Sequence, residues 1–140
     1  MSYTEKEMEL LKTSYEKLRA SVALRPGAFY DTLFMHAPEL RSMFREDLEG
    51  QSMKFMTTLG VILTRLRDED AVDERFKELG VKHAALGVQA QHFEPMENAL
   101  IETLRGELGA SFTSELDALW RRAFQTIAER MIRRGNISEQ

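Results

Sequence analysis

Apolar residues along this chain recur every three or four positions, with polar and charged residues between them. This spacing places the apolar residues on one face of an α-helix, so it predicts helices over most of the chain. Because alternating runs of β-branched residues are missing, we expect an all-α fold of about six to eight helices. The predicted helical segments are 4–24, 28–37, 51–67, 71–86, 95–108 and 114–131, with a short helical corner at 38–44.

Residues typical of helix ends lie between these segments. Thr4 and Glu7 have the spacing of a capping box, and Thr113 is a second N-cap candidate. Gly87 is suited to ending the fourth long segment. The polar stretch before Gln51 is predicted to be irregular, so the third long helix should begin at Gln51.

Length and composition indicate one folded domain. With 140 residues the chain can bury one sizeable core, so residues 1–140 are predicted to form a single domain. The net charge of −4 supplies no basic surface for nucleic acid. Every apolar run is far shorter than the roughly 20 residues that span a bilayer, and the start lacks the pattern of a signal peptide. We therefore expect a cytoplasmic monomer or homodimer that contacts neither nucleic acid nor membrane.

One titratable side chain lies on an apolar helical face. His83 shares that face with Phe76, Leu79 and Leu86. A histidine at such a position is more often a hydrogen-bonded core residue than a ligand, and both interpretations are open. One ring nitrogen can bond a carbonyl one turn earlier, that of Leu79, and the other nitrogen then needs a partner. Haem iron, which brings its own further ligands, is the leading example of such a partner.

The other two histidines have ordinary explanations. His36 lies in the last turn before Pro38, where a cation complements the helix dipole. His92 precedes a helix and is predicted to be a solvated loop residue. No histidine has another four residues later or an acidic residue three residues earlier, which disfavours zinc-protease and di-iron sites. The absence of cysteine also excludes thiolate metal sites.

Two polar side chains, Tyr30 and Gln51, share helical faces with apolar residues. If both point inward, they supply hydrogen-bond donors on the side of the core opposite His83. If the Tyr30 hydroxyl instead reaches the surface and Gln51 merely starts its helix, neither has a functional role. The residues alone favour neither alternative.

Five motifs occur in a fixed order over nearly the whole chain. They are FYDTLFMHAPELRSMF, QSMKFM, LGVKHAALGV, HF followed closely by Pro95, and LDALWRRAF. In this order and spacing the chain resembles bacterial single-domain haemoglobins and the globin module of flavohaemoglobins. The resemblance implies a globin fold, a 3-over-3 helical sandwich around one haem b (iron protoporphyrin IX).

The resemblance also implies roles for individual residues. His83 matches the proximal ligand that binds the haem iron, and Tyr30 and Gln51 match the distal tyrosine and glutamine. Phe44 matches the aromatic residue that packs flat on the porphyrin. The other cofactor-binding candidates are Phe55, Val88, Phe93 and Met96.

The implied function is reversible binding of O₂, CO and NO at a five-coordinate ferrous haem. Two departures from the family concern the tyrosine and glutamate that support its proximal histidine, since Phe93 and Gly135 stand at those positions. Without a carboxylate that supports it, the ligating imidazole donates less strongly to iron, which disfavours peroxide chemistry. We therefore expect oxygen binding or transport, with NO dioxygenation if a separate reductase supplies electrons.

Two further functions remain as alternatives. One is a haem-based gas or redox sensor that acts through a partner, and the other is a haem-free, globin-like interaction module. The chain ends soon after its last predicted helix, so we expect neither a flavin reductase domain nor a signalling domain. A visible spectrum of the protein supplied with haem would separate the haem-free module from the other functions.

Overall fold

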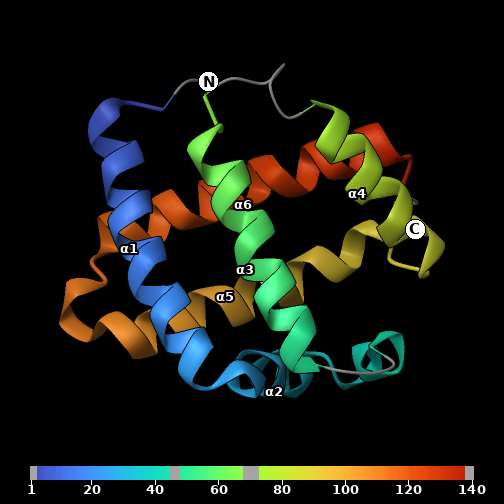
Figure 1. Ribbon diagram of the computed structural model, residues 1–140, viewed down its shortest axis with the longest axis horizontal. Helices are drawn as coiled ribbons and strands as arrows, with labels where there is room; N and C mark the ends of the chain where they lie inside the picture. The colour runs from blue at the N-terminus through green and yellow to red at the C-terminus, as the bar shows by residue number, and fades with distance from the viewer. Residues whose placement is uncertain (1–2, 45–47, 68–72, 138–140) are drawn as a thin grey trace.

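The computed structural model describes residues 3–44, 48–67 and 73–137, and helices account for most of these residues (Figure 1). No strand occurs in the described ranges, which confirms the all-α prediction. In chain order the elements are α1 (Glu5–Leu24), α2 (Pro26–His36), the 3₁₀-helix η1 (Pro38–Met43), α3 (Leu48–Thr64), α4 (Asp73–Ala85), η3 (Ala90–His92), α5 (Phe93–Leu108), η4 (Gly109–Ser111) and α6 (Ser114–Gly135).

The predicted helix caps are confirmed. The Thr4 hydroxyl accepts a hydrogen bond from the Glu7 amide at 3.0 Å, and the Glu7 carboxylate accepts one from the Thr4 amide at 2.9 Å. The Thr113 hydroxyl accepts from the Leu116 amide at 3.1 Å at the start of α6. Helix α4 ends two residues before Gly87, whose φ of 91° is accessible to glycine at little cost.

The predicted start of α3 is wrong by three residues. The helix begins at Leu48 rather than at Gln51, although the local sequence is polar. Leu48 packs against the core, and Glu49 places an acidic side chain in the first turn, where the helix dipole favours it. Helix α2 likewise starts earlier than predicted, because Pro26 occupies the first helical position.

Parts of three predicted segments lie outside the described residues. They are the first three residues of the predicted irregular stretch 45–50, the predicted helix end near Asp68, and the predicted helix start at Ala71. Helix α3 ends at Thr64 and residues 65–67 form a turn, so the helix predicted to run through residue 67 ends three residues earlier than expected.

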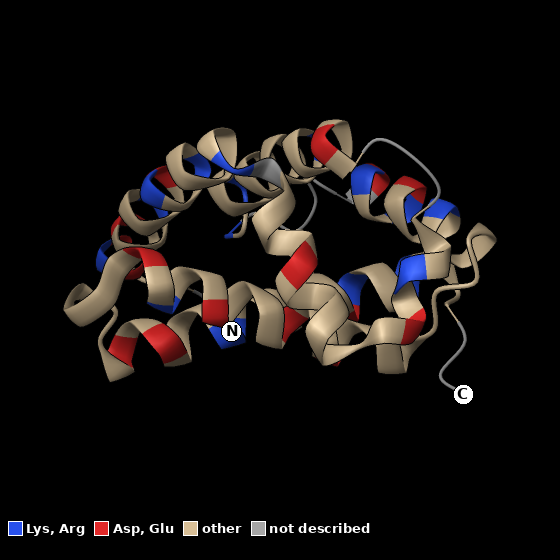
Figure 2. Cartoon of the chain, turned by 90° about the horizontal axis from the view of Figure 1, so that it is seen from below, with Lys and Arg blue, Asp and Glu red and all other residues tan. Residues whose placement is uncertain are grey.

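The helices pack in two layers, which Figure 2 shows edge-on. Among the described residues the most extensive contacts join α4 to α6, α2 to α5, and α1 to α3. The apolar residues that recur along α6 are buried, among them Leu116, Leu119, Trp120, Phe124, Ile127 and Met131. The largest of them, Trp120, is 1% exposed and donates from Nε1 to the Ser14 hydroxyl at 2.8 Å.

The start of α1 is tied to α6 by a second set of bonds. The Glu7 carboxylate accepts hydrogen bonds from both terminal nitrogens of Arg122, at 3.1 and 3.2 Å. The Arg122 guanidinium also lies over the Tyr3 ring, 4.3 Å from its centroid. These contacts join opposite ends of the sequence.

Charged residues of both signs are interspersed along the helices (Figure 2). Throughout the described part of the chain, no helix combines the length and apolar character needed to cross a bilayer.

Candidate functional site

His83 lies half-buried in the last turn of α4. Its Nδ1 atom is 2.7 Å from the carbonyl oxygen of Leu79, as the sequence predicts. Since a carbonyl oxygen only accepts, Nδ1 carries the proton, and a neutral ring then presents a free lone pair at Nε2. No hydrogen bond from a described residue reaches Nε2. The ring is thus in the tautomer in which Nε2 can ligate a metal.

The chain turns sharply after His83. The Val88 amide donates to the His83 carbonyl at 3.1 Å, and the Phe93 ring lies near-parallel to the imidazole, with centroids 6.4 Å apart and an interplanar angle of 25°. Leu86, predicted to share the apolar face, is 57% exposed. That part of the prediction is wrong because α4 ends at Ala85, so helical spacing no longer governs where Leu86 points.

Tyr30 lies within α2 and is buried among aromatic rings. Its side chain is 3% exposed, and its ring centroid is 5.3 Å from that of Phe29, 6.2 Å from Phe34 and 5.0 Å from Phe44. Burial raises the pKa of the Tyr30 phenol to about 12, so the hydroxyl is a neutral donor at physiological pH. The low exposure of the whole residue argues against the alternative in which Tyr30 extends to the surface. None of the described residues accepts its proton.

Phe55 of α3 extends this group of rings. It stacks on Phe29 with centroids 5.3 Å apart and an interplanar angle of 19°, which joins α3 to α2. Phe29 and Phe34 were missed as candidates for the site. In the sequence, only their positions relative to Tyr30 could have indicated them. Phe29 directly precedes Tyr30, and Phe34 follows it by one helical turn. We call this set the aromatic cluster, comprising Phe29, Tyr30, Phe34, Phe44 and Phe55.

Gln51 lies in α3, one helical turn before Phe55. Its side chain is half-buried and makes no hydrogen bond with a described residue, Tyr30 included. Its amide is therefore free to donate to a ligand, but the structure does not bring it into contact with the Tyr30 hydroxyl.

The apolar candidates share an intermediate degree of burial. They are Phe44 at the end of η1, Phe55 of α3, Val88 after α4, and Phe93 and Met96 of α5. A flat apolar macrocycle would cover the parts of these side chains that the protein leaves exposed. Within the described ranges no group of three or more His, Cys, Asp or Glu side chains could hold a metal ion. A metal on His83 would thus take its other ligands from a cofactor, and these residues fit haem.

The other histidines have partners away from this site. His36 ends α2 as predicted, and its Nε2 lies 2.6 Å from a carboxylate oxygen of Glu102. His92 is not the solvated residue that its position predicts. Its ring is half-buried, and Nδ1 accepts a hydrogen bond from the Gln89 amide at 2.9 Å.

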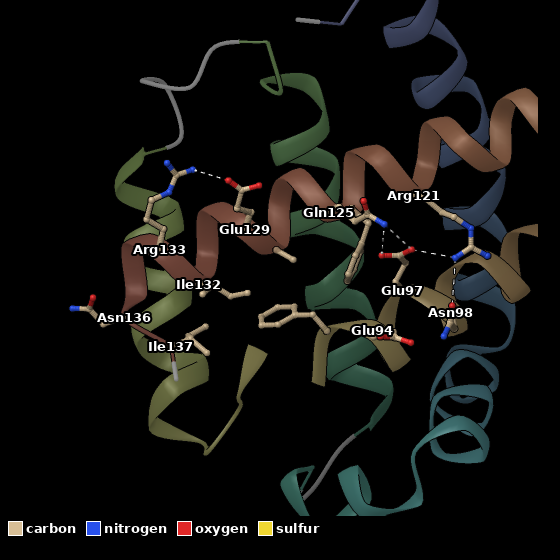
Figure 3. A pocket seen from close by; sticks show the side chains of 13 residues that line it. Glu94, Glu97, Asn98, Arg121, Gln125, Glu129, Ile132, Arg133, Asn136 and Ile137 are labelled. Atoms are coloured by element: carbon tan, nitrogen blue, oxygen red, sulfur yellow. Dashed lines mark hydrogen bonds and ion pairs between the residues drawn. The ribbon is translucent and has the colours of Figure 1, made fainter. Parts of the chain in front are cut away.

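A groove of about 910 Å³ lies between the start of α5 and the second half of α6 (Figure 3). On its wall Glu97 accepts hydrogen bonds from Arg121 at 3.1 Å and from Gln125 at 3.2 Å. Of the candidate site residues, all of which are described, Phe93 alone lines this groove. The bond between Glu97 and Arg121 joins α5 to α6, and the Glu129–Arg133 ion pair lies within α6.

Fold and site together define an all-helical protein with one histidine available to a metal and an aromatic cluster formed by α2, α3 and the intervening corner. The globin family model matches residues 27–131, so the chain belongs to the globin family, whose members bind haem. This finding confirms the resemblance on which the globin prediction was based.

Individual relatives differ in function and length. An anaerobic nitrite reductase of Gossypium hirsutum is 30% identical over 145 residues, covering 92% of this chain and 91% of the relative. A flavohaemoprotein of Bacillus subtilis is 22% identical over 130 residues, and the match covers 91% of this chain but only 33% of that protein. The chain therefore spans about a third of the flavohaemoprotein.

Among solved structures, the protein is similar to an engineered carbene transferase derived from a suggested nitric oxide dioxygenase of Rhodothermus marinus. The TM-score is 0.81 at 24% identity, with 96% of this chain and 94% of that chain covered. At this identity the similarity shows the fold, which is the predicted globin sandwich.

Proposed function

We propose that this globin is a single domain that holds haem b through His83 and reversibly binds O₂, CO and NO. The observation that carries the proposal is the bond from His83 Nδ1 to the Leu79 carbonyl, which leaves Nε2 as the only ring nitrogen able to ligate iron. Ferrous haem supplies an open coordination position for a diatomic gas.

The chain's own residues determine which gas is favoured. The Tyr30 hydroxyl is neutral, buried and without an acceptor among the described residues, so it can donate to a polar ligand. The Gln51 amide is a second donor. Phe44 and Phe55 supply apolar surface that excludes water. These features favour O₂, which becomes negatively charged on binding, over the less polar CO.

NO dioxygenation is the second candidate activity. It consumes one NO, one O₂ and one electron and releases nitrate, so repeated turnover needs an electron donor, for which we propose a reductase. The similarity to a flavohaemoprotein and to the R. marinus protein is the reason to propose this activity as a candidate. The Nδ1 proton of His83 is accepted by a backbone carbonyl, which is a weaker acceptor than a carboxylate. The imidazole therefore donates less electron density to iron, which disfavours peroxide chemistry. We place the protein in the cytoplasm, as a monomer or homodimer.

A visible spectrum of the reduced protein, with and without CO, tests the haem site. We expect an intense Soret band that His83→Ala abolishes or displaces and that the control His92→Ala retains. An unchanged spectrum in His83→Ala would show that the ligand assignment is wrong. No Soret band in wild-type protein supplied with haem would favour a haem-free interaction module.

Consumption of NO separates the binder from the enzyme. The O₂-loaded protein is mixed with NO and a reductant, and nitrate is counted per haem. One nitrate per haem supports a gas-binding protein, whereas many support a dioxygenase. Because the G. hirsutum relative is a nitrite reductase, nitrite consumption without O₂ should be measured on the same preparation.

A further inference from the structure

Helices α4 and α6 touch through their backbones at Gly80 and Gly135. A Cβ atom added to Gly80 would lie 2.5 Å from the Met131 carbonyl oxygen and 2.6 Å from the Gly135 Cα atom. One added to Gly135 would meet the Gly80 Cα atom and carbonyl carbon even more closely. Since ordinary contacts of a Cβ atom are 3.4–4 Å, only glycine fits at both positions without movement of the helices.

This contact is a major support for α4. Among the described residues, α6 supplies most of the contacts that α4 makes with other helices. In Figure 1 α4 accordingly lies against the C-terminal end of α6. The position of α4 in the fold is therefore set mainly by α6.

Gly80, which contacts Gly135, and His83 lie within one helical turn of each other in α4. Gly80 follows Leu79, whose carbonyl oxygen holds His83 Nδ1 at 2.7 Å. His83 itself lies three residues after Gly80 and is joined to it by rigid helix. A displacement of α4 from α6 at Gly80 would consequently carry the imidazole with it.

We propose that Gly80 and Gly135 are positioning residues that set how closely His83 approaches the haem iron. The inference rests on the proposed ligand role of His83. By the resemblance, flavohaemoglobins have a glutamate at the position that Gly135 occupies in this chain. A side chain of that size would not fit beside Gly80. Close approach of two helix backbones thus takes the place of a carboxylate in fixing the proximal ligand.

The test uses Gly135→Ala in the full-length protein loaded with haem. The added methyl group must move α4 and α6 apart, and the resonance Raman band of the iron–histidine stretch in the ferrous protein should shift. Gly106→Ala is the matched control, because a Cβ atom there has nothing within 4 Å. It should leave the band unchanged. Circular dichroism verifies that each variant remains folded.

The same substitution in a His83→Gly variant distinguishes an effect on the position of His83 from a general disturbance of the haem pocket. In His83→Gly, free imidazole added to the solution replaces the side chain as ligand and has no covalent link to α4. Gly135→Ala should then leave the iron–imidazole band unchanged. Equal shifts in both backgrounds would overturn the proposal, as would an unshifted band in folded Gly135→Ala with His83 present.

Met131→Ala covers the case in which Gly135→Ala does not fold. It removes a buried side chain of α6 one turn before Gly135 and introduces no clash. A displaced band is expected with His83 and an unmoved band with free imidazole. Because Met131→Ala removes volume instead of adding it, the direction of the displacement need not match that in Gly135→Ala. A band that does not move with His83 present, or that moves equally in both backgrounds, overturns the proposal. If wild-type protein lacks the iron–histidine band, or if the band survives His83→Ala, the proposed function itself fails.

Discussion

The Nδ1 atom of His83 lies 2.7 Å from the carbonyl oxygen of Leu79, one turn earlier in α4. The bond fixes the orientation and tautomer of the ring without adding a negative charge beside it. The neighbouring Phe93 ring has no hydroxyl, and Gly135 has no side chain. In the proposed ligand role, the imidazole would be supported by backbone alone, which suits reversible gas binding better than chemistry that needs a strongly donating ligand.

Removal of the Tyr30 hydroxyl should weaken O₂ binding selectively. A charge-assisted hydrogen bond contributes roughly 1.5–3 kcal/mol, so Tyr30→Phe should speed O₂ dissociation by about 10- to 150-fold. CO dissociation should change much less. Stopped-flow ligand replacement measures both rates. Tyr3→Phe is the matched control, since Tyr3 is equally buried but bonds Thr126 of α6. Equal acceleration for both gases would contradict the hydrogen-bond account.

Gln51→Leu should produce a smaller effect in the same direction. The Gln51 side chain is half-buried, so water competes for its amide, and a hydrogen bond of about 0.5–1.5 kcal/mol corresponds to roughly 2- to 12-fold faster O₂ dissociation. The same experiment with CO is the reference. An effect larger than that of Tyr30→Phe would show that Gln51, rather than Tyr30, is the main donor.

The raised pKa of Tyr30 predicts a loss of stability at high pH. Below pH 10 the phenol is neutral in both states, and between pH 10 and about 12 only the unfolded chain ionises, so the free energy of unfolding falls as pH rises. The loss should be at most about 3 kcal/mol. Urea unfolding of Tyr30→Phe should show a shallower fall. Tyr15, whose pKa is also raised by burial, should account for part of the remainder. Parallel pH curves for wild type and Tyr30→Phe would refute the prediction.

The bond between Trp120 and Ser14 should contribute measurably to stability. Ser14→Ala leaves the buried indole N–H without its acceptor, at a cost of about 1–3 kcal/mol. The same substitution should cost less in a Trp120→Phe background, where the donor is gone. Chemical denaturation of the double-mutant cycle measures the coupling. Exposed Ser111→Ala is the control. A coupling energy of zero would show that the bond is not important for stability.

Local features of this chain were predictable from sequence because their geometry is set within one helical turn. The capping box of Thr4 and Glu7 and the cap at Thr113 follow from spacing alone. The same is true of the bond between His83 and Leu79, since a side chain four residues along a helix reaches that carbonyl. The roles proposed for the remaining site residues are still predictions.

Features that depend on contacts between distant segments could not be predicted. The approach of Gly80 to Gly135 has no local signal, because a glycine within a helix can equally mark flexibility or open space. His36 pairs with Glu102 on another helix, which its own neighbours do not indicate. The early start of α3 depends on packing of Leu48 against the core, which overrides the polar character of the local sequence.

The bidentate bond between Glu7 and Arg122 has a consequence for the order of assembly. During synthesis α1 emerges from the ribosome long before α6 is made. Arg122 therefore becomes available to Glu7 only when nearly the whole chain has been synthesised. In the meantime α1 can pack only against the helices already synthesised, which are α2, α3 and then α5. Nascent chains stalled before residue 122 should therefore be more susceptible to proteolysis near their N-terminus than the complete chain.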